Sequence, residues 1–239
     1  VLTFFAVDKA QFLSILPQRI FAQLDVFAFM AMPLFILTAE IMSRAGVTRS
    51  LINFAMAIVG RFRGGLGHVN ILTSVFFAGI SGSAIADSAA LSRTFVPEMR
   101  AQGYSQYYAG AITAASSMIG PIIPPSIIMI IYGGLTGASV AALFIAGVVP
   151  GLLLASSLML LNGIIAHIKG HPGGTSHDLP RFLPSLLNAA PALCLPLVIL
   201  GSLVFGLATP TEGSAIAVFF ALVAGHFYKG LSWKMIFDA

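Results

Sequence analysis

The stretch GAITAASSMIGPIIPPSI, residues 110–127, decides how the middle of this chain folds. Three prolines stand within five residues there, at Pro121, Pro124 and Pro125. Proline has no backbone N–H, its ring clashes with the preceding helical turn, and it pushes the residue before it out of the helical region. One continuous helix through 107–135 is therefore excluded, and we expect two half-helices that meet mid-way.

The composition around this break is that of a membrane protein. Of 239 residues, 58% are hydrophobic and only 8% are charged, and the mean hydropathy is +0.97. Soluble domains carry about a quarter charged residues, whereas apolar runs of ~20 residues suit ~30 Å of hydrocarbon. We expect an all-α polytopic membrane protein. The single cysteine, Cys194, excludes a disulfide framework, and we expect it to be a small buried hydrophobe.

The apolar runs predict the path of the chain through the membrane. An amphipathic segment at 48–62 is predicted to lie at the interface, and the polar connector 169–181 is predicted to be a cytoplasmic loop. Arginines and lysines flank the runs on one side, which the positive-inside rule assigns to the cytoplasm. Both ends of the sequence read as truncations of a longer protein. The five expected spans are 24–43, 107–135, 139–168, 183–207 and 213–228.

A second weak point lies inside the apolar segment 65–92. Its centre reads Gly-Ile-Ser-Gly-Ser at 79–83, and each glycine costs a helix about 1 kcal/mol against alanine. Two interpretations remain open: a single span that ends near Arg93, or a re-entrant hairpin that enters and leaves on the cytoplasmic side. Arginines flank both ends of the segment, so the hairpin fits the charge rule better.

The two breaks offer only oxygen ligands. Unpaired backbone groups cost several kcal/mol in lipid, so broken helices persist where they line a cavity and bind something. Hydroxyl and carbonyl oxygens suit Na⁺, whereas zinc prefers histidine and cysteine. Glycine and serine also serve as packing surfaces between membrane helices, but two centrally broken segments favour binding. The candidate ligands are the hydroxyls of Ser81, Ser83, Ser116, Ser117 and Ser126, the carbonyls around Gly120 and Pro121, and the carboxylate of Asp87.

Three acidic residues allow specific expectations. Asp87 follows the first break, where it either supports a cation electrostatically or caps a half-helix. Glu40 is expected to pair with Arg44 at i,i+4. Glu212 fits the first turn of a helix capped by Thr209 or Thr211. No phosphate-binding loop of the GxxxxGK[ST] type occurs, which argues against ATP hydrolysis.

Five motifs in one order resemble a known family, the large membrane subunit of tripartite ATP-independent periplasmic (TRAP) transporters. The resemblance covers nearly the whole chain. The motifs are GGLGHVN at 64–70, FAGISGSAIADSAAL at 77–91, GAITAASSMIGPIIPPSI at 110–127, IYGGLTGASVAALFIAGVVPGLL at 131–153 and FGLATPTEGSAIAVFFAL at 205–222.

The resemblance implies a permease rather than an enzyme. It implies a multi-pass protein of the bacterial inner membrane, with an ion-transporter-superfamily fold and an elevator mechanism. Uptake of organic acids, such as C4-dicarboxylates or sialic acid, would be driven by Na⁺ as the coupling ion, without another cofactor. The implied partners are a small membrane subunit, a periplasmic substrate-binding protein and the lipid bilayer; no nucleic acid is expected.

The resemblance also implies roles for individual residues. Ser81, Gly82 and Ser83 would form the tip of the first hairpin, and Ser116, Ser117, Gly120 and Pro121 the facing break, which together make a Na⁺ site. Substrate would contact Ser83, Asp87, Pro124, Pro125 and Ser126. Residues 1–63 would be a scaffold span with an interfacial arm, 64–135 the transport-domain hairpin and broken helix, and 136–239 scaffold spans with the connector 169–182. A second hairpin and a second Na⁺ site would lie beyond Ala239.

Three alternatives remain open at this point. A proton-coupled or exchange permease would share the same fold but not the Na⁺ requirement. An intramembrane hydrolase would use Ser81 or Ser83 with Asp87 or His68. A purely structural scaffold subunit would leave uptake unchanged when Ser81 or Ser117 is replaced by alanine.

Overall fold

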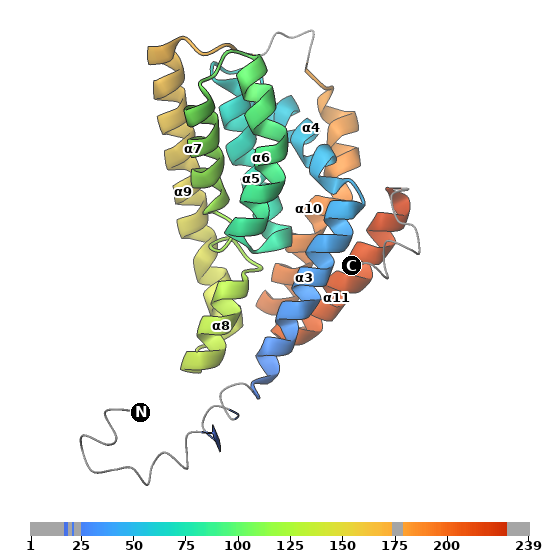
Figure 1. Ribbon diagram of the computed structural model, residues 1–239. Coiled ribbons are helices and arrows are strands. Elements are labelled where there is room, and N and C mark those ends of the chain that lie inside the picture. The colour runs from blue at the N-terminus through green and yellow to red at the C-terminus, as the bar shows by residue number, and fades with distance from the viewer. Residues whose placement is uncertain (1–16, 19–20, 22–24, 174–178, 229–239) are drawn as a thin grey trace, which may run out of the picture.

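The computed structural model describes residues 17–18, 21, 25–173 and 179–228, and this part of the chain is built from helices (Figure 1). The described helices are η2 (Phe27–Met30), α3 (Ala31–Arg44), α4 (Val47–Val59), α5 (Gly65–Ser81), α6 (Ala84–Ala101), α7 (Gln106–Ser117), α8 (Ile127–Thr136), α9 (Val140–Lys169), α10 (Phe182–Val204) and α11 (Pro210–Phe227). The all-α class is confirmed.

The break predicted from the prolines is confirmed. Helix α7 ends at Ser117 and α8 begins at Ile127. Ser126 caps α8: its hydroxyl accepts a hydrogen bond from the Met129 N–H at 3.3 Å and donates one to the Pro121 carbonyl at 2.6 Å. We call residues 118–126 the helix break.

The glycine-serine segment turns the chain back on itself. Helix α5 ends at Ser81, Gly82 adopts a left-handed φ of 60°, and Ser83 caps α6 by accepting a hydrogen bond from the Ala86 N–H at 3.4 Å. Helices α5 and α6 then run side by side in opposite directions (Figure 1). The described chain therefore forms a hairpin at 65–101, with its tip at Gly82 and Ser83. Entry of both limbs from one side of a membrane stays a prediction.

Three helical segments of the described residues are long and apolar enough to cross a membrane: Phe27–Arg44, Val140–Lys169 and Phe182–Val204. They correspond to three of the predicted spans. The predicted span 213–228 coincides with α11, a helix of 18 residues outside this group. The prediction for Cys194 is wrong in one respect, because the thiol is free but exposed rather than buried.

Helix α4 confirms the helix expected near 48–62, and it packs against its neighbours. Its apolar residues Leu51, Phe54 and Ala55 are buried, and its partners are α5 and α10. At 13 residues it is too short to span a membrane. Its place at the membrane interface stays a prediction.

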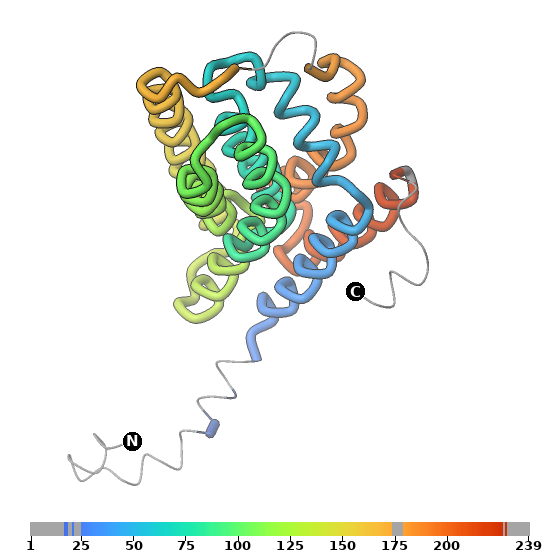
Figure 2. The backbone as a smooth tube through the Cα atoms, turned by 45° about the horizontal axis from the view of Figure 1, so that its top comes forward, coloured from blue at the N-terminus to red at the C-terminus, as the bar shows by residue number. Residues whose placement is uncertain are grey.

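Two apolar cores hold the bundle together. One joins α3, α10 and α11 to α4, to the end of α5, to α8 and to the start of α9, and includes Phe35, Leu51 and Leu195. The other joins α5, α6 and α7 to the middle of α9, and includes Leu91 and Phe95. In Figures 1 and 2 the green hairpin accordingly lies between α9 on one side and α3 and α4 on the other. The predicted domain boundaries stay predictions.

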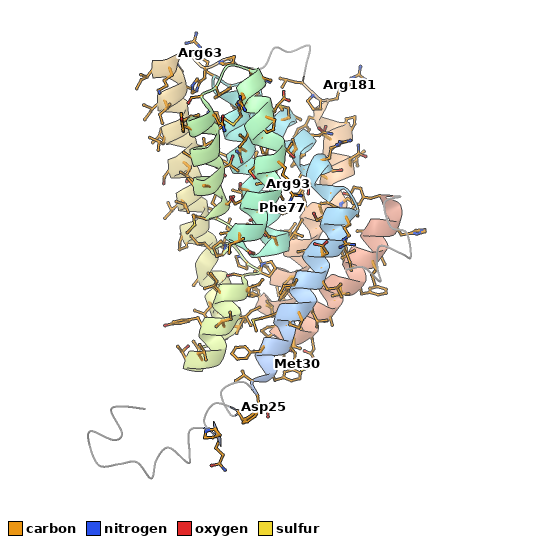
Figure 3. All side chains as sticks on the ribbon, in the orientation of Figure 1. Asp25, Met30, Arg63, Phe77, Arg93 and Arg181 are labelled. Carbon is orange, nitrogen blue, oxygen red and sulfur yellow. The ribbon has the colours of Figure 1, made fainter. Side chains whose placement is uncertain are left out.

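The hairpin is fixed to α9 near its open end. The Asn162 amide of α9 donates a hydrogen bond to the Gly64 carbonyl at 3.1 Å. Gly67 of α5 passes so close that a Cβ there would lie 2.1 Å from Asn162 Oδ1. Arg63 and Arg181 lie at this end of the bundle, and Met30 and Asp25 lie at the opposite end (Figure 3). We call the end that carries Arg63 and Arg181 the arginine end.

Candidate functional site

The hairpin tip lies directly against the helix break. A Cβ built on Gly82 would lie 2.3 Å from the Pro125 carbonyl oxygen and 3.2 Å from Ser126 Cα. A Cβ on Gly120 would lie 2.5 Å from Asp87 Oδ2 and 3.3 Å from the Ser83 carbonyl carbon. Both glycines are therefore required by close approach, and the structure brings the two breaks predicted from sequence into contact.

Helix α9 supports the break from the other side. A Cβ on Gly147 would lie 2.3 Å from the Ile122 carbonyl oxygen, and one on Gly151 would lie 2.4 Å from Ile123 Cγ1. Glycines four residues apart on a membrane helix allow a neighbouring backbone to approach in this way. The break is thus held between the hairpin tip and α9.

Asp87 is the charged group at this contact. It lies in the first turn of α6, and its side chain is fully buried. The Ser81 hydroxyl donates a hydrogen bond to Oδ1, while Oδ2 has no hydrogen-bond partner among the described residues. The cap of α6 is Ser83 rather than Asp87. Of the two roles considered from sequence, the capping role is therefore taken by another residue.

The remaining tip and break residues add oxygen atoms to the contact between the hairpin and the break. The Ser83 backbone N–H donates to the Ser81 hydroxyl at 3.3 Å. On the break, the Ser126 hydroxyl donates a hydrogen bond to the Pro121 carbonyl. The Pro125 carbonyl faces Gly82. Pro124 lies nearer the first limb, with its carbonyl oxygen 3.8 Å from a Cβ built on Gly79.

Ser116 and Ser117 have other hydrogen-bond partners. The Ser74 hydroxyl of α5 donates to Ser116 Oγ at 3.0 Å, and the Ser117 hydroxyl donates to the Thr113 carbonyl at 2.7 Å. Next to them the Asn70 amide donates to Thr113 Oγ1 at 2.6 Å. These buried side chains join α5 to α7, a role that the sequence analysis did not foresee for Asn70, Ser74 or Thr113.

The arrangement has the chemistry of a cation site. A carboxylate buried without an opposite charge costs several kcal/mol, and a bound cation or a proton removes that cost. The neighbouring donors are hydroxyl and carbonyl oxygens, which suit a hard monovalent ion. The residues around Asp87 therefore fit Na⁺, although the assignment of individual ligands stays a prediction.

The same geometry excludes one of the two bases considered for the hydrolase alternative. His68 and Ser81 lie on one helix thirteen residues apart, which corresponds to about 20 Å along its axis. A general base must reach the nucleophile within hydrogen-bond distance or through one water molecule. His68 cannot serve Ser81 or the adjacent Ser83 in that role. Asp87, the other base considered, accepts a hydrogen bond from the Ser81 hydroxyl, so this geometry does not weaken the pairing of Ser81 with Asp87.

The family model of the tripartite ATP-independent periplasmic transporter, DctM component, matches residues 1–239. The chain belongs to this family. The DctM family consists of transporter permease subunits rather than enzymes, and these are inner-membrane proteins. The three long apolar helices agree with that location.

Several curated relatives of the DctM family align with almost the whole chain. The sialic acid TRAP transporter permease protein SiaT of Haemophilus influenzae is 38% identical over 239 residues, which is all of this chain and 39% of the relative. The C4-dicarboxylate TRAP transporter large permease protein DctM of Pseudomonas aeruginosa is 39% identical over 228 residues, 95% of this chain and 53% of the relative. The 2,3-diketo-L-gulonate TRAP transporter large permease protein YiaN of Escherichia coli is 37% identical over 223 residues, 93% and 52% respectively. The chain thus spans about half the length of such relatives, or less.

Proposed function

We propose that this chain is part of the large permease subunit of a Na⁺-coupled TRAP transporter that imports an organic acid. A periplasmic binding protein would deliver the substrate, and a small membrane subunit would complete the membrane complex. The relatives are named for sialic acid, C4-dicarboxylates and 2,3-diketo-L-gulonate. The hairpin and the broken helix would form one half of the transport site in an elevator-type fold.

The observation that carries the proposal is the buried carboxylate of Asp87 between the tip and the break. Oδ2 lies 2.5 Å from the position of a Cβ on Gly120 and has no hydrogen-bond partner among the described residues. Under the proposal, Na⁺ offsets this charge and holds Ser81, Ser83 and the break together. Substrate carboxylate would then bind beside Ser83, Ser126 and the backbone of Pro124 and Pro125.

The test is uptake by the complete transporter in proteoliposomes, with its binding protein supplied outside. Labelled sialic acid and succinate serve as probes, and an inward Na⁺ gradient is compared with a choline gradient at the same membrane potential. We expect uptake of one probe to require Na⁺. Uptake at the full rate in choline would refute Na⁺ coupling.

The same carboxylate also favours one alternative, a proton-coupled permease. A proton on Asp87 would neutralise the buried charge as a cation does. Uptake that is independent of Na⁺ but driven by an inward proton gradient would support this alternative. Uptake that needs neither ion, but needs substrate on the opposite side, would indicate an exchanger.

A further inference from the structure

A cleft of about 470 Å³ separates α3 from the second limb of the hairpin. Its lining includes the tip serines, Ser81 and Ser83, and continues along α6 to Arg93. Glu40 and Ser43 of α3 form part of the opposite wall. The cleft therefore extends from the tip serines of the candidate site to the positively charged guanidinium of Arg93.

Arg93 lies farther from the arginine end than the other labelled arginines. Figure 3 shows it at mid-height near Phe77, whereas Arg63 and Arg181 lie at the arginine end. On α6 it precedes Arg100 by seven residues, which is about 10 Å along the helix axis. The positive-inside rule counts Arg93 among the arginines that flank the segment 65–92 and set its orientation, but Arg93 does not lie at the arginine end. Arg93 is exposed, and its side chain lines the cleft.

The charge of Arg93 is not balanced within the cleft. Glu40, the carboxylate in the lining, is paired with Arg44, whose Nε lies 2.6 Å from Oε1. Arg93 makes no hydrogen bond or ion pair with any described residue. Ala89 and Ala86 lie one and two turns before it on the same face of α6 and are exposed. The small side chains leave room for a ligand between the tip and the guanidinium.

We infer that this cleft is a second binding position for the organic carboxylate, with Arg93 as its cationic residue. The inference rests on the proposed function. Ser83 and Arg93 are ten residues apart, about 15 Å along the helix. A four-carbon diacid does not reach from one to the other. Arg93 therefore meets substrate that has left the tip, and it acts on the rate of transfer toward the arginine end rather than on recognition at the tip.

The first test measures the charge in the cleft without any transport. In the complete transporter in nanodiscs, with native cysteines replaced, Ala89→Cys is modified with an anionic and a cationic methanethiosulfonate of similar size. The Coulomb energy of one charge at ~8 Å in water changes each rate about two- to threefold, so Arg93→Gln should lower the anionic-to-cationic rate ratio about fivefold at low salt. Tyr107→Cys, an exposed site outside the cleft, is the control and should not respond.

The second test measures transport through the cleft. Arg93→Gln should lower the maximal uptake rate of succinate or sialic acid about tenfold, with little change in the concentration that gives half-maximal rate. Arg93→Lys should retain most of the rate, because it keeps the charge. Arg100→Gln, on the same helix but outside the cleft lining, should behave as wild type.

The two tests separate failure of the inference from failure of the proposed function. An unchanged modification ratio in Arg93→Gln would overturn the inference, even if wild-type uptake is Na⁺-coupled. A wild-type uptake rate in Arg93→Gln would also overturn it. A wild type that takes up either probe at the full rate in choline would contradict the proposed function, whatever the modification ratio.

Discussion

Replacing Gly82 with alanine tests the contact between tip and break. The residue has a φ of 60°, and a left-handed conformation costs a non-glycine residue about 1–2 kcal/mol. The new Cβ would also lie 2.3 Å from the Pro125 carbonyl oxygen. That atom is backbone in a segment stiffened by proline, so it cannot rotate away. Overpacking of this kind costs about 1–3 kcal/mol, which gives a total of about 2–5 kcal/mol.

Gly170→Ala is the matched control. Gly170 also ends a helix in the left-handed region, with a φ of 65°, but a Cβ there would have nothing within 4 Å. The control therefore carries the conformational cost without the steric cost. The difference between the two variants isolates the contact of Gly82 with the break, about 1–3 kcal/mol.

The assay compares Na⁺ dependence and thermal unfolding of the complete transporter. If the tip must lie on the break for the cation to bind, an extra 1–3 kcal/mol raises the half-saturating Na⁺ concentration by roughly 5- to 150-fold. Gly170→Ala should leave that concentration near the wild-type value. Equal Na⁺ dependence and equal unfolding temperatures for Gly82→Ala and Gly170→Ala would refute the described packing.

Two further predictions separate binding from structure. Asp87→Asn should raise the half-saturating Na⁺ concentration at least about tenfold without lowering the unfolding temperature, because it removes a buried charge and keeps the side-chain shape; a lower unfolding temperature with unchanged Na⁺ dependence would contradict the cation role. Ser116→Ala should cost about 1 kcal/mol of stability through its lost bond with Ser74, measured as a lower unfolding temperature, with Na⁺ dependence unchanged. A Na⁺ effect in Ser116→Ala that exceeds its stability effect would instead support the role predicted from sequence.

The local features of the chain were predictable because each depends on a few neighbouring residues. Three prolines within five residues cannot all sit in one continuous helix, so the break at 118–126 follows from their close spacing. Prolines that are more widely spaced lie inside helices of this chain: Pro97, Pro150, Pro191 and Pro196. The same holds for the capping box at α11, where Thr209 and Glu212 bond each other's backbone N–H groups. The predicted ion pair of Glu40 with Arg44 is also present. In each case the partners lie within one or two helical turns.

The neighbours that Ser116 and Ser117 meet in the fold were not predictable from nearby residues. Ser116 and Ser117 are neighbours on α7, and consecutive positions on a helix point about 100° apart. Which of them meets α5 depends on how α7 packs on that helix, and Ser116 meets Ser74, 42 residues away in the sequence. Cys194 illustrates a related limit. An apolar run indicates burial in a soluble protein, but in a membrane protein lipid-facing positions are apolar as well, so the run did not establish that the thiol is buried.

Asp87 links the packing of the site to coupling under the proposed function. Because Ser83 already caps the N-terminus of α6, the carboxylate of Asp87 is not needed as the cap. Its burial beside Gly120 is a net cost when no cation is bound. A cation that binds beside Asp87 removes the cost of burying the carboxylate, and it stabilises the contact of tip and break by that amount. Ion occupancy and closure then favour each other, as any ligand favours the state that binds it. Coupling of Na⁺ binding to closure would thus require only the buried charge of Asp87 at the contact of tip and break, where Gly82 and Gly120 allow the close approach.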